Sequence, residues 1–134
     1  MPSTAHPPTS SPSTPDRAMR AVMAKDRRAW LDCFAEDAVV HDPVGGSPVD
    51  PDGLGLMGHA GLERFWDALV APMSSIRFQV RQEHRAGRSV ARVATVTAEL
   101  DGVGALTYDG VFVYDLDDEG RIAALRGYFE LPVG

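Results

Sequence analysis

Apolar side chains recur at helical spacing in the first half of the chain. The clearest series ends before Pro72 and occupies positions i, i+3, i+4, i+7 and i+8: Leu62, Phe65, Trp66, Leu69 and Val70. An upstream series has similar spacing but is interrupted near Lys25 and Asp26: Met19, Val22, Met23, Trp30, Leu31 and Phe34. With Asp16 as a candidate N-cap, these patterns predict two short helices near the start and a third helix before Pro72.

The second half of the chain reads as β-strands, with apolar and polar residues alternating most clearly in the first. Strands are predicted over residues 76–81, 90–100, 107–116 and 121–131. A shorter apolar run at residues 37–42 precedes Pro43, which favours extended backbone just before it. Helices followed by an antiparallel meander predict an α+β domain, a cone of three helices on a strongly curved, mainly antiparallel sheet. Such a cone can enclose an apolar pocket for a small organic ligand.

Composition narrows the class of protein. The chain has 134 residues and a formal net charge of −6, and its arginines are scattered among carboxylates, so nucleic acid is not an expected partner. Residues 1–16 are rich in Pro, Ser and Thr and are predicted to be a disordered tail, which leaves residues 17–134 as one domain. No run reaches the ~18 apolar residues of a membrane helix. With Cys33 as the single cysteine, we expect a cytoplasmic protein without a disulfide.

Three motif matches do not carry chemistry. The segment Gly53–Gly58 spells G-x-G-x-x-G, but no strand leads into it and no parallel βαβ unit follows. The acidic turn at 115–120 resembles the start of a calcium loop, but Arg126 stands where a bidentate glutamate is needed. The domain's histidines lack metal-ligand spacing: His41, His59 and His84. We expect neither a metal nor a cofactor.

Asp42 is the main candidate for chemistry. Strand alternation puts it on the same face as Ala38 and Val40, so its carboxyl is expected to be partly removed from water. Burial raises the pKa of a carboxyl, and a raised pKa suits a base that takes a proton from carbon and returns it. The alternative is structural, because Asp before Pro-x-Gly is a common turn former.

The segment Phe34–Gly45, which contains the sequence HDPVG, resembles the corresponding stretch of the bacterial steroid Δ5-isomerases of the nuclear transport factor 2-like superfamily. Residues 58–70, especially 62–66, are similar to the third helix of that family, and residues 120–122 and 125–129 are similar to its last strand. The resemblance covers everything except the tail. It implies the cone fold, a small hydrophobic substrate, pairing into a homodimer, and Asp42 as the residue that shuttles a proton between two substrate carbons.

The chain also departs from this family. Ala18 aligns with the tyrosine of the oxyanion hole, and Phe112 falls near the aspartic acid that is the second donor. A three-residue shift of the hairpin would bring Asp109 to that place, and Trp66 aligns with a pocket tyrosine and could donate through its indole N–H. Whether another tyrosine supplies an acid stays open, with three candidates: Tyr108, Tyr114 and Tyr128.

Two hypotheses about function follow. In the first, the protein is a ketosteroid isomerase-like enzyme that moves a proton on a steroid or polyketide-like carbonyl compound, with Asp42 as the base. The pocket is then predicted to be lined by Phe34, Val40, Trp66, Phe112 and Phe129. Alternatively, it is a non-catalytic module that binds a hydrophobic ligand. A related epoxide hydrolase or cyclase is a variant of the first hypothesis, although Gly127 and Met73–Ser75 stand where those enzymes carry further carboxylates.

Overall fold

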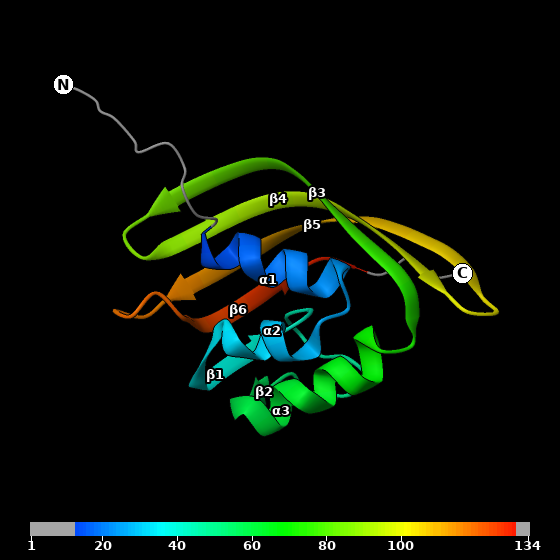
Figure 1. Cartoon of the computed structure of the whole chain (residues 1–134), viewed down its shortest axis with the longest axis horizontal. Coiled ribbons are helices and arrows are strands. Elements are labelled where there is room, and N and C mark those ends of the chain that lie inside the picture. Colours follow the sequence, from blue (N-terminus) through cyan, green and yellow to red (C-terminus); the bar gives the residue numbers. More distant parts are fainter. Residues whose placement is uncertain (1–12, 131–134) are drawn as a thin grey trace.

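The computed structural model describes residues 13–130 and contains three helical segments followed by the long strands (Figure 1). The helical elements are α1 (Thr14–Met23), α2 (Arg27–Asp32), α3 (Gly58–Phe65) and the π-helical turn η1 (Trp66–Val70). The strands are β1 (Phe34–His41), β2 (Leu56–Met57), β3 (Met73–Ala86), β4 (Ser89–Leu100), β5 (Gly104–Leu116) and β6 (Ile122–Tyr128). None of the described helices is long and apolar enough to cross a membrane.

The six strands form one curved sheet in the order β2-β1-β6-β5-β4-β3. All neighbours are antiparallel except β1 and β6, which run parallel. In Figure 1 the long strands β3, β4 and β5 arch over the helices, so the inner face of the sheet is covered by them. The predicted α+β cone, with a mainly antiparallel sheet, is confirmed.

The start of α1 and the end of α2 differ from the predicted helix boundaries. Helix α1 begins at Thr14, because the Ser13 side chain accepts the Asp16 N–H and acts as N-cap in place of Asp16. Thr14 and Pro15 are buried, so the ordered domain starts inside the predicted 1–16 tail, whose first twelve residues lie outside the described part. Phe34 opens β1 and does not extend α2.

Helix α3 does not continue as an α-helix to Val70, as its spacing predicted. From Trp66 the backbone widens into η1, a single π-helical turn. Such turns are frequent at functional sites because they change the direction of side chains without breaking the helix. Here the turn carries Leu69 and Val70 to the wall of a cavity.

Lys25 fixes the end of this turn. Its ammonium group donates to the carbonyls of Val70 at 3.1 Å and Ala71 at 3.0 Å, and also to that of Met73. One charged donor thereby satisfies two carbonyls at the end of η1, those of Val70 and Ala71, and the carbonyl of Met73 at the start of β3.

Replacing Lys25 with methionine is expected to lower the free energy of unfolding by about 1–3 kcal/mol, because hydrogen bonds to a charged donor are lost. Urea denaturation measures this difference. The matched control is Arg28→Met, since the side chain of Arg28 is 85% exposed and its removal is expected to cost about 0.5 kcal/mol or less. Equal losses in the two variants would contradict the role of Lys25.

Candidate functional site

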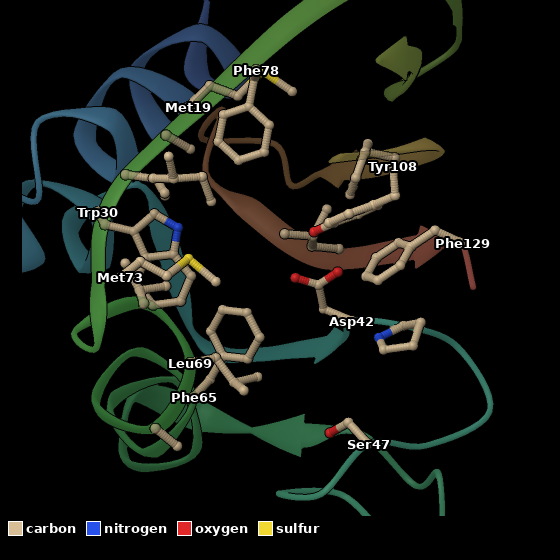
Figure 2. Close-up of a pocket in the computed structure, with 18 of the residues that line it drawn as sticks. Met19, Trp30, Asp42, Ser47, Phe65, Leu69, Met73, Phe78, Tyr108 and Phe129 are labelled. Carbon is tan, nitrogen blue, oxygen red and sulfur yellow. The ribbon is translucent and has the colours of Figure 1, made fainter. Parts of the chain in front are cut away.

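A cavity of about 260 Å³ lies between the inner face of the sheet and the helices (Figure 2). Its walls are almost entirely apolar and come from α1, α2, α3, η1 and four of the strands. The few side chains with polar groups at the wall are Trp30, Asp42, Ser47, Tyr108 and Tyr114. An apolar cavity with few polar groups is typical of a site for a small organic molecule.

Asp42 follows the last residue of β1 and points its carboxyl into the cavity (Figure 2). The next turn is tied to the sheet by the Val44 N–H, which donates to the carbonyl of Gly127 at 2.8 Å. Asp42 Oδ1 is fully buried and has no hydrogen-bond partner among the described residues. Burial without compensation disfavours the charged form and raises the pKa of Asp42 from 3.8 to about 7.

Gly127 on β6 makes room for this carboxyl. A Cβ at position 127 would lie 2.6 Å from Asp42 Oδ1 and 2.9 Å from the ring of Phe129. Both distances are shorter than van der Waals contact, so any side chain here would displace Asp42 or the ring. The glycine therefore lets the carboxyl lie directly against the sheet.

Aromatic rings form the wall beside Asp42. The rings of Tyr108 and Phe129 are 4.7 Å apart, those of Phe112 and Phe129 are 5.8 Å apart, and Phe78 meets Phe112 edge-on at 6.3 Å. These ring contacts form a packed apolar surface beside the Asp42 carboxyl. The aromatic wall accounts for the burial of Asp42 Oδ1, although Asp42 lies just beyond the end of β1.

Two tyrosine hydroxyls that sequence analysis left unassigned belong to the cavity, those of Tyr108 and Tyr114. Neither hydroxyl makes a hydrogen bond within residues 13–130, and neither is among the buried side-chain atoms there that lack a partner, which are Asp42 Oδ1 and Arg121 Nε. Burial raises the pKa of both phenols, and the Asp42 charge adds to this effect, so both stay protonated. Alternation along β5 indicates the inward direction of both tyrosines, because they lie an even number of residues from Phe112. Tyr128, by contrast, is exposed.

The structure divides the predicted lining residues into two groups. Phe112 and Phe129 line the cavity. Phe34, Val40 and Trp66 belong instead to the buried hydrophobic core, in which α3 packs against β1. The indole at the cavity is that of Trp30, whose ring centroid lies 5.4 Å from that of Trp66.

Asp109 does not fit the predicted role of an oxyanion donor. Its side chain is exposed on the outer face of the sheet, where Oδ1 accepts a hydrogen bond from Thr95 at 2.6 Å. The register needed to turn it inward does not occur, because Asp109 pairs with Thr95 while Tyr108 and Phe112 hold the inward positions of β5.

Ala18 lines the cavity from α1 and offers no side-chain donor there. His41 points the other way, as strand parity predicted, and its ring lies over Gly55. Within the described chain, no three His, Cys, Asp or Glu side chains gather closely enough to hold a metal ion. The chemical groups of the site are thus one carboxyl, two phenols, an indole and the Ser47 hydroxyl in an apolar enclosure.

A curved sheet closed by helices over a site of this kind defines a small-molecule pocket of the nuclear transport factor 2-like type. The chain belongs to the SnoaL-like domain family, whose match spans residues 16–125. This agrees with the resemblance found in the sequence.

Solved structures give the same assignment. The structure of RV0760c from Mycobacterium tuberculosis in complex with estradiol-17beta-hemisuccinate is 30% identical, covers 88% of this chain and 92% of its own, and has a TM-score of 0.82. A Delta 5-3-ketosteroid isomerase from Mycobacterium sp. is 32% identical with a TM-score of 0.81, covering 87% and 90%. A computationally designed 17-OHP binder is 32% identical with a TM-score of 0.81, covering 88% and 90%. A comparison with curated proteins gives no match.

Proposed function

We propose that this protein catalyses proton transfer on a hydrophobic carbonyl compound, with Asp42 as the general base. The observation that carries the proposal is the Asp42 carboxyl, which faces the cavity with a buried, unpartnered Oδ1 and a pKa of about 7. A base of this strength is ionised near neutral pH yet still binds a proton taken from carbon.

The proposed reaction moves a double bond. The Asp42 carboxylate takes a proton from the carbon next to the carbonyl, and the C–H electron pair forms an enolate. The protonated Asp42 then returns the proton to another carbon of the conjugated system, so no proton is gained or lost overall. A steroid or a polyketide-like ring system is the proposed substrate class, supported by the apolar aromatic walls and by the similarity to an isomerase and binders of steroids.

The test is conversion of a β,γ-unsaturated ketosteroid to its conjugated isomer, followed by ultraviolet absorption. The wild type is expected to turn the compound over, and Asp42→Asn is expected to lose the activity. Equal rates of the two proteins would remove Asp42 from the mechanism.

A second candidate function is binding without catalysis, favoured by Ala18 at the position where the resembling isomerases have a tyrosine. Micromolar binding of steroid ketones with no turnover would favour it. An epoxide hydrolase receives less support, because Gly127 has no carboxylate and no space for one beside Asp42. Met73 at the cavity wall is likewise no acid for an epoxide cyclase.

We also propose that two copies pair through the outer face of the sheet. Val93, Val111 and Tyr128 lie opposite one another on β4, β5 and β6, and the latter two are 36% and 45% exposed. This apolar row suits a second copy of the chain.

A cytoplasmic location stays a prediction.

Light scattering after gel filtration is expected to give the mass of a dimer, and Val111→Lys is expected to give a monomer because a charge enters the apolar row. The matched control is Val103→Lys on the β4–β5 hairpin, where Val103 is already 80% exposed. A dimer that persists in Val111→Lys would refute this interface.

A further inference from the structure

The hydroxyl of Tyr108 lies at the same part of the cavity as Asp42. Figure 2 shows it directed toward the Asp42 carboxyl from the opposite wall. Tyr108 comes from β5 and Asp42 from the end of β1, so the two groups approach a ligand from different strands. The space between them belongs to the cavity.

This hydroxyl is held in place but not used by the protein. The Tyr108 ring packs on Phe129 at 4.7 Å, and its hydroxyl has no hydrogen-bond partner in the described part of the chain. Tyr108 is half-buried and lines the cavity, and its hydroxyl is not among the buried atoms that lack a partner, so its O–H is accessible from the cavity and can donate to a bound ligand. A ligand oxygen between Tyr108 and Asp42 would satisfy it.

We propose that the Tyr108 hydroxyl holds the carbonyl oxygen of the ligand and takes over the donor role that Ala18 cannot fill. The occupant is therefore a ketone whose oxygen lies at Tyr108 while the adjacent carbon lies at Asp42. The catalytic part of this inference rests on the proposed function; the binding part does not.

In the reaction, Tyr108 stabilises the enolate oxygen. As Asp42 removes the proton from carbon, the electron pair moves into the carbon–carbon bond and negative charge develops on oxygen. The Tyr108 O–H donates a hydrogen bond to that oxygen and keeps its own proton. Burial raises the pKa of Tyr108, so the phenol remains a donor also after Asp42 has taken the proton and lost its charge.

Tyr114 is the competing donor, but its surroundings differ. It is 4% exposed, and the charge that acts on it most strongly is that of Arg92, a buried side chain that pairs with Asp16 at 2.6 Å and Glu83 at 2.8 Å. Among the described residues, Asp42 is the one charged group that acts on Tyr108. The Asp42 charge acts on Tyr114 as well, but after that of Arg92, and Figure 2 shows the Tyr108 hydroxyl directed toward the Asp42 carboxyl.

The test compares two probes of one shape, 2-acetylnaphthalene and 2-ethylnaphthalene, of which only the first has a carbonyl oxygen. Binding is measured at about pH 8.5, where the Asp42 carboxyl is ionised and cannot donate. The wild type is expected to bind the ketone more tightly and to lower its infrared carbonyl stretching frequency. Tyr108→Phe is expected to lose the frequency shift and about 3–10-fold in ketone affinity, with affinity for the hydrocarbon unchanged.

Asp109→Asn is the matched control, since Asp109 is next to Tyr108 in the chain but exposed on the outer face, and it is expected to behave as the wild type. A shift that survives in Tyr108→Phe, or that disappears in Tyr114→Phe instead, would overturn the assignment. Equal affinity of the wild type for the two probes would also overturn it.

Steroid turnover separates this inference from the proposed function. Tyr108→Phe is expected to lower kcat by about 10²-fold or more with a smaller change in KM. If Asp42→Asn abolishes turnover and Tyr108→Phe does not lower it, the base stands and the donor assignment fails. If no variant affects turnover but the carbonyl shift depends on Tyr108, the donor site stands and the catalytic proposal fails.

Discussion

Asp42→Asn is expected to reduce kcat/KM for a β,γ-unsaturated ketosteroid by about 10²–10⁴-fold, the usual contribution of a positioned general base. Asparagine keeps the size of the side chain but cannot accept a proton from carbon. In the wild type, kcat/KM is expected to rise with pH and level off above about 7, because only the carboxylate acts as the base. Below that pH the rate is expected to fall about tenfold per unit.

The matched control for this rate is Asp109→Asn, because Asp109 is exposed on the outer face of the sheet. It is expected to retain the wild-type rate and the wild-type pH profile. A pH profile that is flat between about pH 5 and pH 8 in the wild type would contradict Asp42 as the titrating base.

The second large effect concerns stability and needs no substrate. Between pH 3.8 and about 7 the folded protein holds a proton on Asp42 that the unfolded chain releases. Stability therefore falls as pH rises through this window, and the cost of the buried charge is fully present above about 7. An asparagine side chain cannot ionise, so Asp42→Asn is expected to be more stable than the wild type at alkaline pH by up to about 4 kcal/mol.

Urea unfolding at about pH 8 and about pH 4 measures this difference, and the gain is expected to disappear at the lower value. The control Asp109→Asn is expected to change stability by about 0.5 kcal/mol or less at both. A wild type that is as stable as Asp42→Asn at alkaline pH would mean that the carboxyl is hydrated and not buried. That result would remove the physical basis of the proposed base.

Sequence pattern predicted the residue at the centre of the site better than its surroundings. Asp42 shares strand parity with Ala38 and Val40, which are 0% and 1% exposed, so its inward direction followed from alternation alone. The magnitude of the rise in the pKa of Asp42 could not be predicted from the sequence. It depends on burial against Gly127 and Phe129, which are more than eighty residues away along the chain.

The lining residues show where parity stops being sufficient. Val40 and Asp42 share strand parity, but Val40 is buried in the hydrophobic core whereas Asp42 lies at the cavity. Trp66 and Trp30 both carry indoles in apolar helical patterns, and only the packing of the helices against the sheet decides that Trp30 reaches the cavity. Periodicity assigns a face to a residue, whereas the neighbouring element decides whether that face meets a core or a ligand.

The sequence by itself determined the α+β order of elements, the inward direction of Asp42 and the absence of a donor at Ala18, because these depend on local period and residue type. Only the tertiary structure decided that Oδ1 of this carboxyl is buried and that Tyr108 faces it. Both outcomes require the curvature that brings β5 and β6 against the end of β1, and long-range contacts of this kind leave no local pattern in the chain.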